Sequence, residues 1–283
     1  MATVQQTLRQ MRESIQEAYP EPEAGAIAQM VLEHVLQMNR VQLSLNQQQE
    51  ISAEQQEEII HAIARLQQQE PVQYILGISH FYDLELQVDE RVLIPRPETE
   101  ELVDLVIKEH RNKQELLVMD ICTGSGCIPV ALAVNLKGSK VYGLEVSAEA
   151  LEVAKANAAK YKLPVSWLHQ DVFDTIPLKE GTFDIITSNP PYVLEEEQAL
   201  MRPNVLDYEP HLALFVPDSD PLKFYSRIAL LGSKLLKKGG KLYFEINERY
   251  GKGVCELLLE AGFSEAEVVQ DLFNKDRIVR GVL

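Results

Sequence analysis

The sequence predicts an α/β protein, in which a doubly wound, seven-stranded, mostly parallel β-sheet follows a small all-helical N-terminal domain. Apolar residues recur at helical spacing through the first seventy residues, which indicates helices packed on one another. From about residue 98, short apolar runs alternate with amphipathic stretches, as in a parallel sheet covered by helices on both faces. The last two apolar runs have no helix between them, so we expect them to pair antiparallel.

The N-terminal domain is expected to span residues 1–70 and to contain three helices. The first two are predicted by apolar residues at helical spacing: Val4, Leu8, Met11 and Ile15, then Ile27, Met30, Val31 and Val35. The third begins where Ser52 and Gln55 occupy the two positions of a capping box, and it ends before Pro71.

A linker is expected over residues 71–97, followed by a second domain over residues 98–283. Apolar and polar residues alternate in "FYDLELQVD", which predicts one strand of a short hairpin. "LIPRP" is then a loop with two prolines, and an amphipathic helix starts at about Glu98.

The second domain continues as strand and helix in turn. Its predicted strands are "LLVMDIC", "KVYGLEVS", "VSWLHQDVF", "FDIITSN", "GKLYFEI", "AEVVQD" and "DRIVRGVL". The predicted helices are "IPVALAVNL", "AEALEVAKANAAKY", "DPLKFYSRIALLGSKLLKK" and "GKGVCELLLEAG". Sheets of this kind bind ligands at the carboxyl ends of their strands, so the short motifs found there are candidates for a functional site.

The composition limits the location and partners of the protein. No apolar run is long enough to cross a membrane and the chain does not begin like a secretory signal, so we expect a cytoplasmic protein without membrane contact. Cys122, Cys127 and Cys255 have no histidine at ligand spacing, so we expect reduced thiols and no metal site. A net charge of −16 argues against nucleic acid as a direct partner, because phosphate binding relies on basic patches.

The stretch "DICTGSGCIPVALA" predicts a strand, a tight turn and a helix. Gly124 and Gly126 let backbone N–H groups approach a ligand, and the N-terminus of the following helix favours an anionic group. The loop is not a dinucleotide fingerprint, because Pro129 replaces the third glycine, and it lacks the lysine of a Walker loop. Taken alone, it is also compatible with a turn that only lets strand and helix pack.

Glu145 ends the second predicted strand, in "VYGLEVS". An acidic side chain at this position can accept hydrogen bonds from both ribose hydroxyls of a nucleotide, and a solvated strand end is the alternative. The glycine loop lies about twenty residues before it, and this combination indicates an adenosine-type cofactor.

With "SNPPY" after the fourth predicted strand, the sequence resembles the class I S-adenosylmethionine-dependent methyltransferases, which have a Rossmann-like fold. More closely, it is similar to the protein-glutamine methyltransferases that modify bacterial peptide chain release factors. The resemblance covers essentially the whole chain, in "PVQYILG", "FYDLEL", "LIPRPETEELV", "DICTGSGCI", "SNPPY", "YEPHLAL" and "DRIV". It implies methyl transfer from S-adenosyl-L-methionine, leaving S-adenosyl-L-homocysteine, to the glutamine of a release factor's Gly-Gly-Gln loop, which tunes translation termination.

The resemblance also implies the roles of individual residues. It places the cofactor against the loop Cys122, Thr123, Gly124, Ser125 and Gly126, with the ribose on Glu145, the adenine beside Asp171 and Val172, and Asn189 nearby. It places the substrate amide against Asn189, Pro190, Pro191 and Tyr192, of which Asn189, Pro190 and Tyr192 are the catalytic candidates, with Leu93 and Pro97 as walls.

The chain departs from the family pattern at three of these positions. The family usually has glycine at Cys122, aspartate at Glu145 and an aromatic residue at Val172. Because a side chain at positive φ costs about 1 kcal/mol or more, we expect Cys122 not to adopt a glycine-like backbone conformation.

The two prolines of "NPPY" fix the chain as it leaves the strand, which makes either an ordinary strand terminator or a preformed pocket. An amide nitrogen is a poor nucleophile, because its lone pair is delocalised into the carbonyl. The Asn189 side-chain oxygen and the Pro190 carbonyl could accept its two N–H groups, and Tyr192 offers a face for stacking. We interpret the motif as a rigid double acceptor beside an aromatic wall.

Two other functions stay open. Asn-Pro-Pro-Tyr is shared with methyltransferases of nucleic acid bases, so DNA or RNA adenine methylation is the alternative, against which the acidic charge weighs. A regulator that binds the cofactor without turnover is the third, although it has no need for an amide clamp. The small helical domain suits a protein partner, and we expect the protein to be a monomer.

Several further residues have structural interpretations. Glu209 and Pro210 in "YEPHLAL" either shape the cleft or form a loop turn, and His211 is expected to be exposed. Lys237 and Lys238 before Gly239 are interpreted as the end and cap of a helix.

Overall fold

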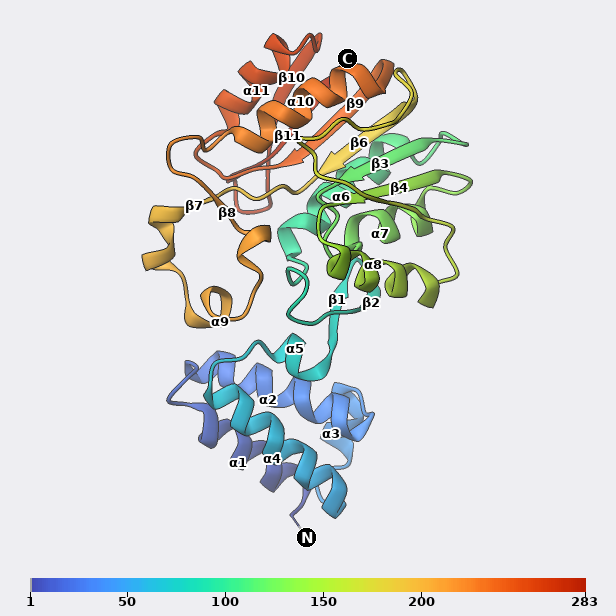
Figure 1. Ribbon diagram of the computed structural model, residues 1–283. Helices are drawn as coiled ribbons and strands as arrows, with labels where there is room; N and C mark the ends of the chain where they lie inside the picture. Colours follow the sequence, from blue (N-terminus) through green and yellow to red (C-terminus); the bar gives the residue numbers. More distant parts are fainter. Residues whose placement is uncertain (1) are drawn as a thin grey trace. The chain divides into compact units, whose positions relative to one another are not determined.

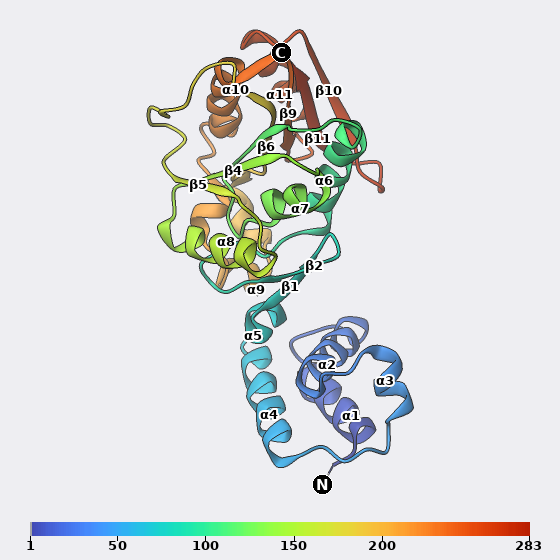
Figure 2. The same ribbon diagram turned by 90° about the vertical axis from the view of Figure 1, so that its right-hand side faces the viewer.

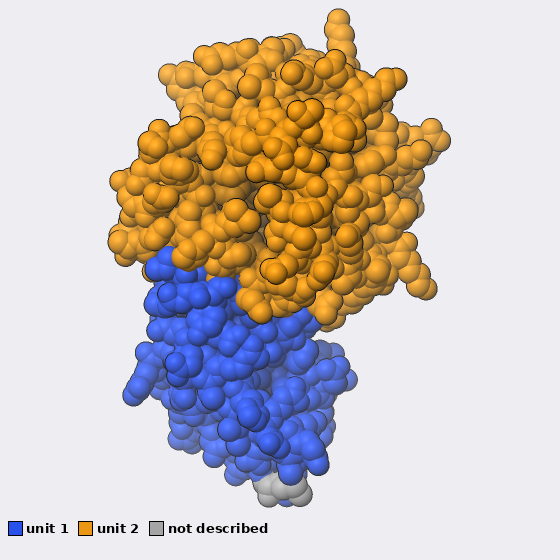
Figure 3. All heavy atoms as spheres, in the orientation of Figure 1, with its two compact units in different colours: residues 1–78, 202–208 blue, residues 79–201, 209–283 orange. Residues whose placement is uncertain are grey.

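The computed structural model describes residues 2–283, which form two compact units (Figure 1, Figure 2). The first unit extends to Ile78 and also contains Arg202–Tyr208. The second unit comprises Ser79–Met201 and Glu209–Leu283, and Figure 3 colours the two units separately.

The first unit is all-helical, and its three predicted helices are α1 (Val4–Ile15), α2 (Glu21–Leu36) and α4 (Ala53–Gln67). Two short helices not predicted from the sequence are α3 (Arg40–Leu45) and α5 (Val72–Leu76). The capping box of Ser52 and Gln55 is confirmed, and glutamines close two further boxes at the starts of α1 and α3. None of the helices within residues 2–283 has both the length and the apolar character needed to cross a bilayer.

A segment distant in sequence completes the first unit. It contains the short helix α9 (Pro203–Leu206). The Arg202 guanidinium donates two hydrogen bonds to the Glu23 carboxylate, at 3.1 and 3.0 Å. At the other end of the segment, the Tyr208 hydroxyl donates to the Gln68 carbonyl oxygen at 2.8 Å. The segment is therefore tied at both ends to the helical unit.

The second unit contains a seven-stranded sheet in the order β10-β11-β9-β6-β3-β4-β5, which confirms the predicted fold class. Its strands are β3 (Leu117–Ile121), β4 (Lys140–Glu145), β5 (Ser166–His169), β6 (Phe183–Ser188), β9 (Leu236–Glu245), β10 (Glu265–Gln270) and β11 (Asp276–Val282). The last two strands pair antiparallel, as predicted, and β11 is also antiparallel to β9.

Helices cover both faces of this sheet (Figure 1). On one face the core is formed with α6 (Pro97–His110), α7 (Cys127–Asn135) and α8 (Ala148–Lys160). On the other face it is formed with α10 (Lys223–Leu235) and α11 (Gly251–Glu260). Because both faces are buried, the central strands are continuous apolar runs rather than alternating ones.

Two small sheets accompany the large one. The predicted hairpin consists of β1 (Ile78–Phe81) and β2 (Leu84–Gln87), joined by Tyr82 and Asp83 at positive φ. The strands β7 (Val193–Leu194) and β8 (Phe215–Val216) pair in parallel just after the "NPPY" motif. Between them lie the 3₁₀ turns η1 (Glu195–Leu200) and η2 (His211–Ala213).

The predicted end of the helix before β9 is wrong. Helix α10 ends at Leu235, and Leu236 is already extended and paired with Phe183 of β6. Lys237 does not interact with a helix end, because its ammonium group donates to both oxygens of Asp184 at 2.8 Å. Strand pairing here overrides the helical periodicity of "LLGSKLLKK".

Candidate active site

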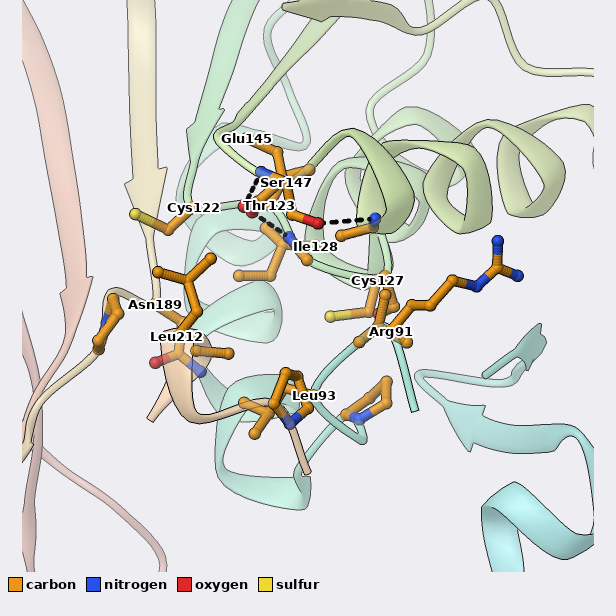
Figure 4. Close-up of a pocket in the computed structure, with 18 of the residues that line it drawn as sticks. Arg91, Leu93, Cys122, Thr123, Cys127, Ile128, Glu145, Ser147, Asn189 and Leu212 are labelled. Atoms are coloured by element: carbon orange, nitrogen blue, oxygen red, sulfur yellow. Dashed lines mark hydrogen bonds between the residues drawn. The ribbon is translucent and has the colours of Figure 1, made fainter. Parts of the chain in front are cut away.

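A cleft opens where β3, β4 and β6 end (Figure 4). Figure 4 shows Glu145 and Ser147 at one end of the cleft, with Asn189, Leu93 and Leu212 toward the other. The predicted site residues that line it are Leu93, Cys122, Thr123, Gly124, Ser125, Glu145, Asn189 and Pro191.

The other predicted site residues lie outside the lining of this cleft. Gly126 forms the N-cap of α7, Val172 is buried in the core, and Pro97 is exposed in the first turn of α6. The Asp171 carboxylate accepts a hydrogen bond from the Phe173 N–H at 2.9 Å. Pro190 is buried and Tyr192 is half-buried. The roles of these residues stay predictions.

The glycine loop leaves β3 with two glycines at positive φ, 52° at Gly124 and 77° at Gly126. A Cβ at Gly124 would meet no atom within 4 Å, so this part of the loop faces open space. A Cβ at Gly126 would lie only 3.0 Å from the Cβ of Ala154, so this glycine permits close packing against α8. Gly124 therefore leaves the backbone open to a ligand, whereas Gly126 allows the loop to pack closely on α8.

The expectation for Cys122 is wrong, because its backbone does adopt the left-handed conformation, with φ of 62°. The residues on either side hold it there. Ile121, the last residue of β3, pairs with Leu144 of β4. The Thr123 N–H donates to the Leu144 carbonyl oxygen at 3.1 Å. Local strain of this kind persists where the surrounding structure fixes the backbone on both sides. Burial raises the pKa of the Cys122 thiol, which therefore stays neutral.

Asp120 is a completely buried acid in the middle of the sheet. Its carboxyl oxygens accept hydrogen bonds from the hydroxyls of Thr123, at 2.6 Å, and Thr187, at 2.7 Å. It therefore joins the start of the glycine loop to the strand that leads to Asn189. Burial raises the pKa of Asp120 to about 7, and the charge of Glu145 acts in the same direction.

We predict that Asp120 makes the free energy of unfolding fall as the pH rises. Between about pH 4 and pH 7 the unfolded chain has lost this proton while the folded chain keeps it, so stability declines over that window, by up to about 4 kcal/mol. Urea unfolding at pH 5 and pH 8 checks this, with Asp120→Asn as the variant that cannot titrate. Other carboxyls contribute equally to both chains, so the same pH dependence in both would contradict the prediction.

Glu145 is 8% exposed, so it is not a solvated strand end. One carboxylate oxygen accepts the Gly124 N–H at 2.9 Å, and the other accepts the N–H groups of Val146, at 2.9 Å, and Ser147, at 3.1 Å. A carboxylate has about four acceptor positions, so three are in use and one remains for a ligand hydroxyl. Glu145 therefore fixes the glycine loop to the end of β4 as well as facing the cleft.

Asn189 follows β6 and contacts a pair of buried polar residues from other elements. Its side-chain Nδ2 donates to the Thr99 Oγ1 at 3.3 Å. Thr99, on α6, donates to Glu245 Oε2 at 2.6 Å, and the Tyr192 hydroxyl donates to Glu245 Oε1 at 3.0 Å. Glu245 ends β9 and is 1% exposed. The two side chains of the motif are thus both connected to one carboxylate.

Comparison with known proteins identifies the family. The chain is 45% identical over 269 residues to the release factor glutamine methyltransferase of Bacteroides thetaiotaomicron, covering 95% of this chain and 96% of the relative. The chain belongs to the release factor glutamine methyltransferases. The corresponding enzyme of Flavobacterium psychrophilum is 39% identical over 274 residues, with 96% of each chain covered.

Two family models match separate parts of the chain, and a solved structure shares its fold. Residues 6–77 match the PrmC N-terminal domain, and residues 99–205 match the methyltransferase small domain. A crystal structure of a methyltransferase from Pyrococcus furiosus is similar with a TM-score of 0.50 and 17% identity, covering 82% of this chain and 98% of that one. At this identity the likeness shows the fold alone.

Glu209 is buried and bonds the segment before α6, which contains Leu93 of the cleft lining. It is 3% exposed and accepts hydrogen bonds from the Arg96 guanidinium and, at 3.1 Å, from the Ile94 N–H. Burial raises the pKa of Glu209, and the charge of Arg96 opposes the rise. The loop that carries Leu93 is thereby fixed beside Pro210, which lines the cleft, while His211 is exposed.

Thr99, which lines the cleft, and Glu245, which is buried, are bonded to Asn189 and Tyr192, and sequence reasoning did not single them out. A signal for each was present. Thr99 lies within "IPRPETE", a family motif, and Glu245 is an acid at the end of an apolar strand in "LYFEI". Buried polar residues at strand and helix ends near a motif are therefore useful candidates for supporting roles.

Proposed function

We propose that this chain transfers a methyl group from S-adenosyl-L-methionine to the side-chain amide nitrogen of the glutamine in the Gly-Gly-Gln loop of a peptide chain release factor. The observation that carries the proposal is Asn189, which lines the same cleft as the glycine loop with its Nδ2 directed to Thr99. Its Oδ1 remains available to accept an N–H from a bound amide.

The residues of the cleft fit a nucleoside with a charged amino-acid end. Open space at Gly124, the N-terminus of α7 and the remaining acceptor position of Glu145 suit a carboxylate and a ribose hydroxyl. S-adenosylmethionine, when bound there, supplies an electrophilic methyl group on a sulfonium. The predicted contacts of Asp171 and Val172 with the adenine are part of this proposal.

The chemical step needs a positioned amide more than a strong base. The lone pair of the amide nitrogen would form the new bond to the methyl carbon that bound S-adenosylmethionine would supply with its sulfur as the leaving group, and the amide would then release one proton to water. Asn189 Oδ1 and the Pro190 carbonyl oxygen accept the two amide N–H groups, which turns the lone pair toward the methyl carbon. Because the two prolines fix these acceptors, little reorganisation is needed when the substrate arrives.

We also propose that the helical domain, residues 1–70, contributes to recognition of the release factor. A match to the PrmC N-terminal domain over residues 6–77 supports a role for this domain separate from that of the methyltransferase domain. The net charge of −16 favours a protein substrate over DNA or RNA, because nucleic acid binding requires compensation of phosphate charge.

A methyl-transfer assay with tritiated cofactor tests the proposed function. The purified chain is given a release factor, the same factor with its loop glutamine replaced by alanine, and adenine-containing DNA and RNA in separate reactions. Label in the first protein alone supports the proposal. Label in nucleic acid alone would instead support adenine methylation, and absence of all label would favour a binding protein.

Glu145→Ala is predicted to weaken cofactor binding by roughly tenfold to a hundredfold, because the variant loses a charged acceptor and the attachment of Gly124. Isothermal titration calorimetry with S-adenosylmethionine measures the effect. Glu149→Ala removes an exposed acid from the first turn of α8 and serves as the control. Unchanged affinity in Glu145→Ala would contradict the ribose assignment.

A further inference from the structure

The side chain of Asn189 is useful to the proposed reaction in only one of its two orientations. Its Oδ1 must face the substrate amide to accept an N–H, so its Nδ2 must bond another acceptor. The two ends of a carboxamide have nearly the same shape, so packing alone distinguishes them poorly, and hydrogen-bond partners decide the orientation.

The Nδ2 group of Asn189 bonds Thr99, which also lines the cleft and has a fixed polarity. The Thr99 hydroxyl has a single proton, and it donates this proton to Glu245 Oε2 at 2.6 Å. The Thr99 oxygen can therefore only accept from Asn189, and it receives the Nδ2 group at 3.3 Å. An Asn189 turned around would bring two acceptor oxygens together with no proton between them.

The polarity of Thr99 in turn depends on Glu245. An ionised carboxylate only accepts hydrogen bonds, and here its second oxygen accepts from the Tyr192 hydroxyl at 3.0 Å. Burial raises the pKa of Glu245 above its usual value, and the hydrogen bonds from Thr99 and Tyr192 and the charge of Arg277 offset only part of this rise. Glu245 is thus held between two hydroxyl donors, with a guanidinium charge nearby.

We infer that Glu245 and Thr99 form a positioning relay, which sets the orientation of the Asn189 amide and holds the Tyr192 ring for the methyl-transfer step. The inference rests on the proposed function and deepens it. This role does not require either residue to contact the reacting atoms. The carboxylate fixes the hydroxyl as a donor, the hydroxyl fixes the amide as a donor, and the amide oxygen is left facing the substrate.

Thr99→Val tests the relay, because valine keeps the shape of threonine and removes its hydroxyl. We expect kcat for release factor methylation to fall about tenfold to a hundredfold, with the KM for the release factor and the cofactor dissociation constant within about threefold of wild type. Thr99→Ser restores the hydroxyl and should recover most of the rate. Glu245→Gln, which keeps the shape but adds a donor, should lower kcat in the same way.

A double-mutant cycle separates this role from a general loss of structure. If Thr99 acts through the Asn189 amide, Thr99→Val should cost less than about twofold in a chain that already contains Asn189→Ala. Single-turnover assays with tritiated cofactor are sensitive enough for the slow variants, and thermal unfolding checks that each is folded. Should a variant at Glu245 fail to fold, Thr99→Val and Thr99→Ser carry the test alone.

The outcomes distinguish the relay from the proposed function. A selective fall in kcat that serine restores and that disappears without Asn189 supports the relay. A wild-type rate in Thr99→Val, or an equal loss with and without Asn189, overturns the relay while the function stands. If the wild-type chain labels no release factor glutamine, the proposed function fails and the relay with it.

Discussion

Asn189→Ala is expected to lower kcat for release factor methylation by about a hundredfold to a thousandfold, while S-adenosylmethionine affinity stays within a few-fold. The variant removes an acceptor that is needed when the amide lone pair turns toward the methyl carbon, and that contributes less to the ground state. Tritiated methyl transfer under saturating substrate measures kcat, and calorimetry measures the cofactor affinity.

Asn135→Ala is a suitable control for this experiment. Asn135 is an exposed asparagine at the end of α7, and its side-chain Nδ2 donates to the Ala131 carbonyl oxygen of its own helix at 2.9 Å. Its activity should match wild type. A loss of cofactor affinity in Asn189→Ala as large as its loss of kcat would mean that Asn189 serves the cofactor instead of the substrate.

Gly143→Ala is expected to destabilise the second unit by about 3 kcal/mol and to lower its melting temperature by roughly 6–12 °C. Gly143 lies in β4, opposite Trp167 of β5. A Cβ there would lie 2.5 Å from Cζ3 of Trp167 and 3.1 Å from the Thr123 hydroxyl oxygen. The indole must move or the two strands must separate, and either change disturbs the start of the glycine loop. Differential scanning calorimetry measures the shift.

Two further variants test the cause of this loss. Gly253→Ala, in α11 of the same unit, places its Cβ at an ordinary 3.4 Å from Leu222 and should be neutral or stabilising by about 0.5–1 kcal/mol. Adding Trp167→Leu to Gly143→Ala should recover part of the lost stability. A melting temperature of Gly143→Ala equal to wild type would show that the strands accommodate the methyl group.

Periodicity predicted the fold well because burial imposes it directly on the sequence. The apolar runs of β3 and β6 are continuous since helices cover both faces, and the antiparallel end followed from the missing helix between β10 and β11. The end of α10 was missed because the helix runs directly into the strand within "LLKK", and pairing of Leu236 with Phe183 decides where the helix ends. A local sequence pattern cannot show this pairing, because Leu236 and Phe183 are far apart in the chain.

The site was predictable only where its parts are local in sequence. The glycine loop, Glu145 and Asn189 each lie at the carboxyl end of a strand, and parallel strands bring these ends together. Thr99 and Glu245 stand 146 positions apart, so their contact appears only after folding. The backbone conformation of Cys122 was predicted wrongly because residues other than glycine ordinarily avoid positive φ. The pairing of Ile121 and the hydrogen bond of the Thr123 N–H hold Cys122 in that conformation, and these contacts exist only in the folded chain.

The segment Arg202–Tyr208 has a practical consequence for dissecting this protein. Since it belongs to the helical unit, the boundary between the units crosses the chain three times, after Ile78, after Met201 and after Tyr208. A fragment that starts at Ser79 would retain α9 but lose Glu23 and Gln68, to which the two ends of the segment are bonded. A faithful separation of the catalytic unit therefore requires excision of this internal segment and a short bridge in its place, in addition to truncation of the N-terminus.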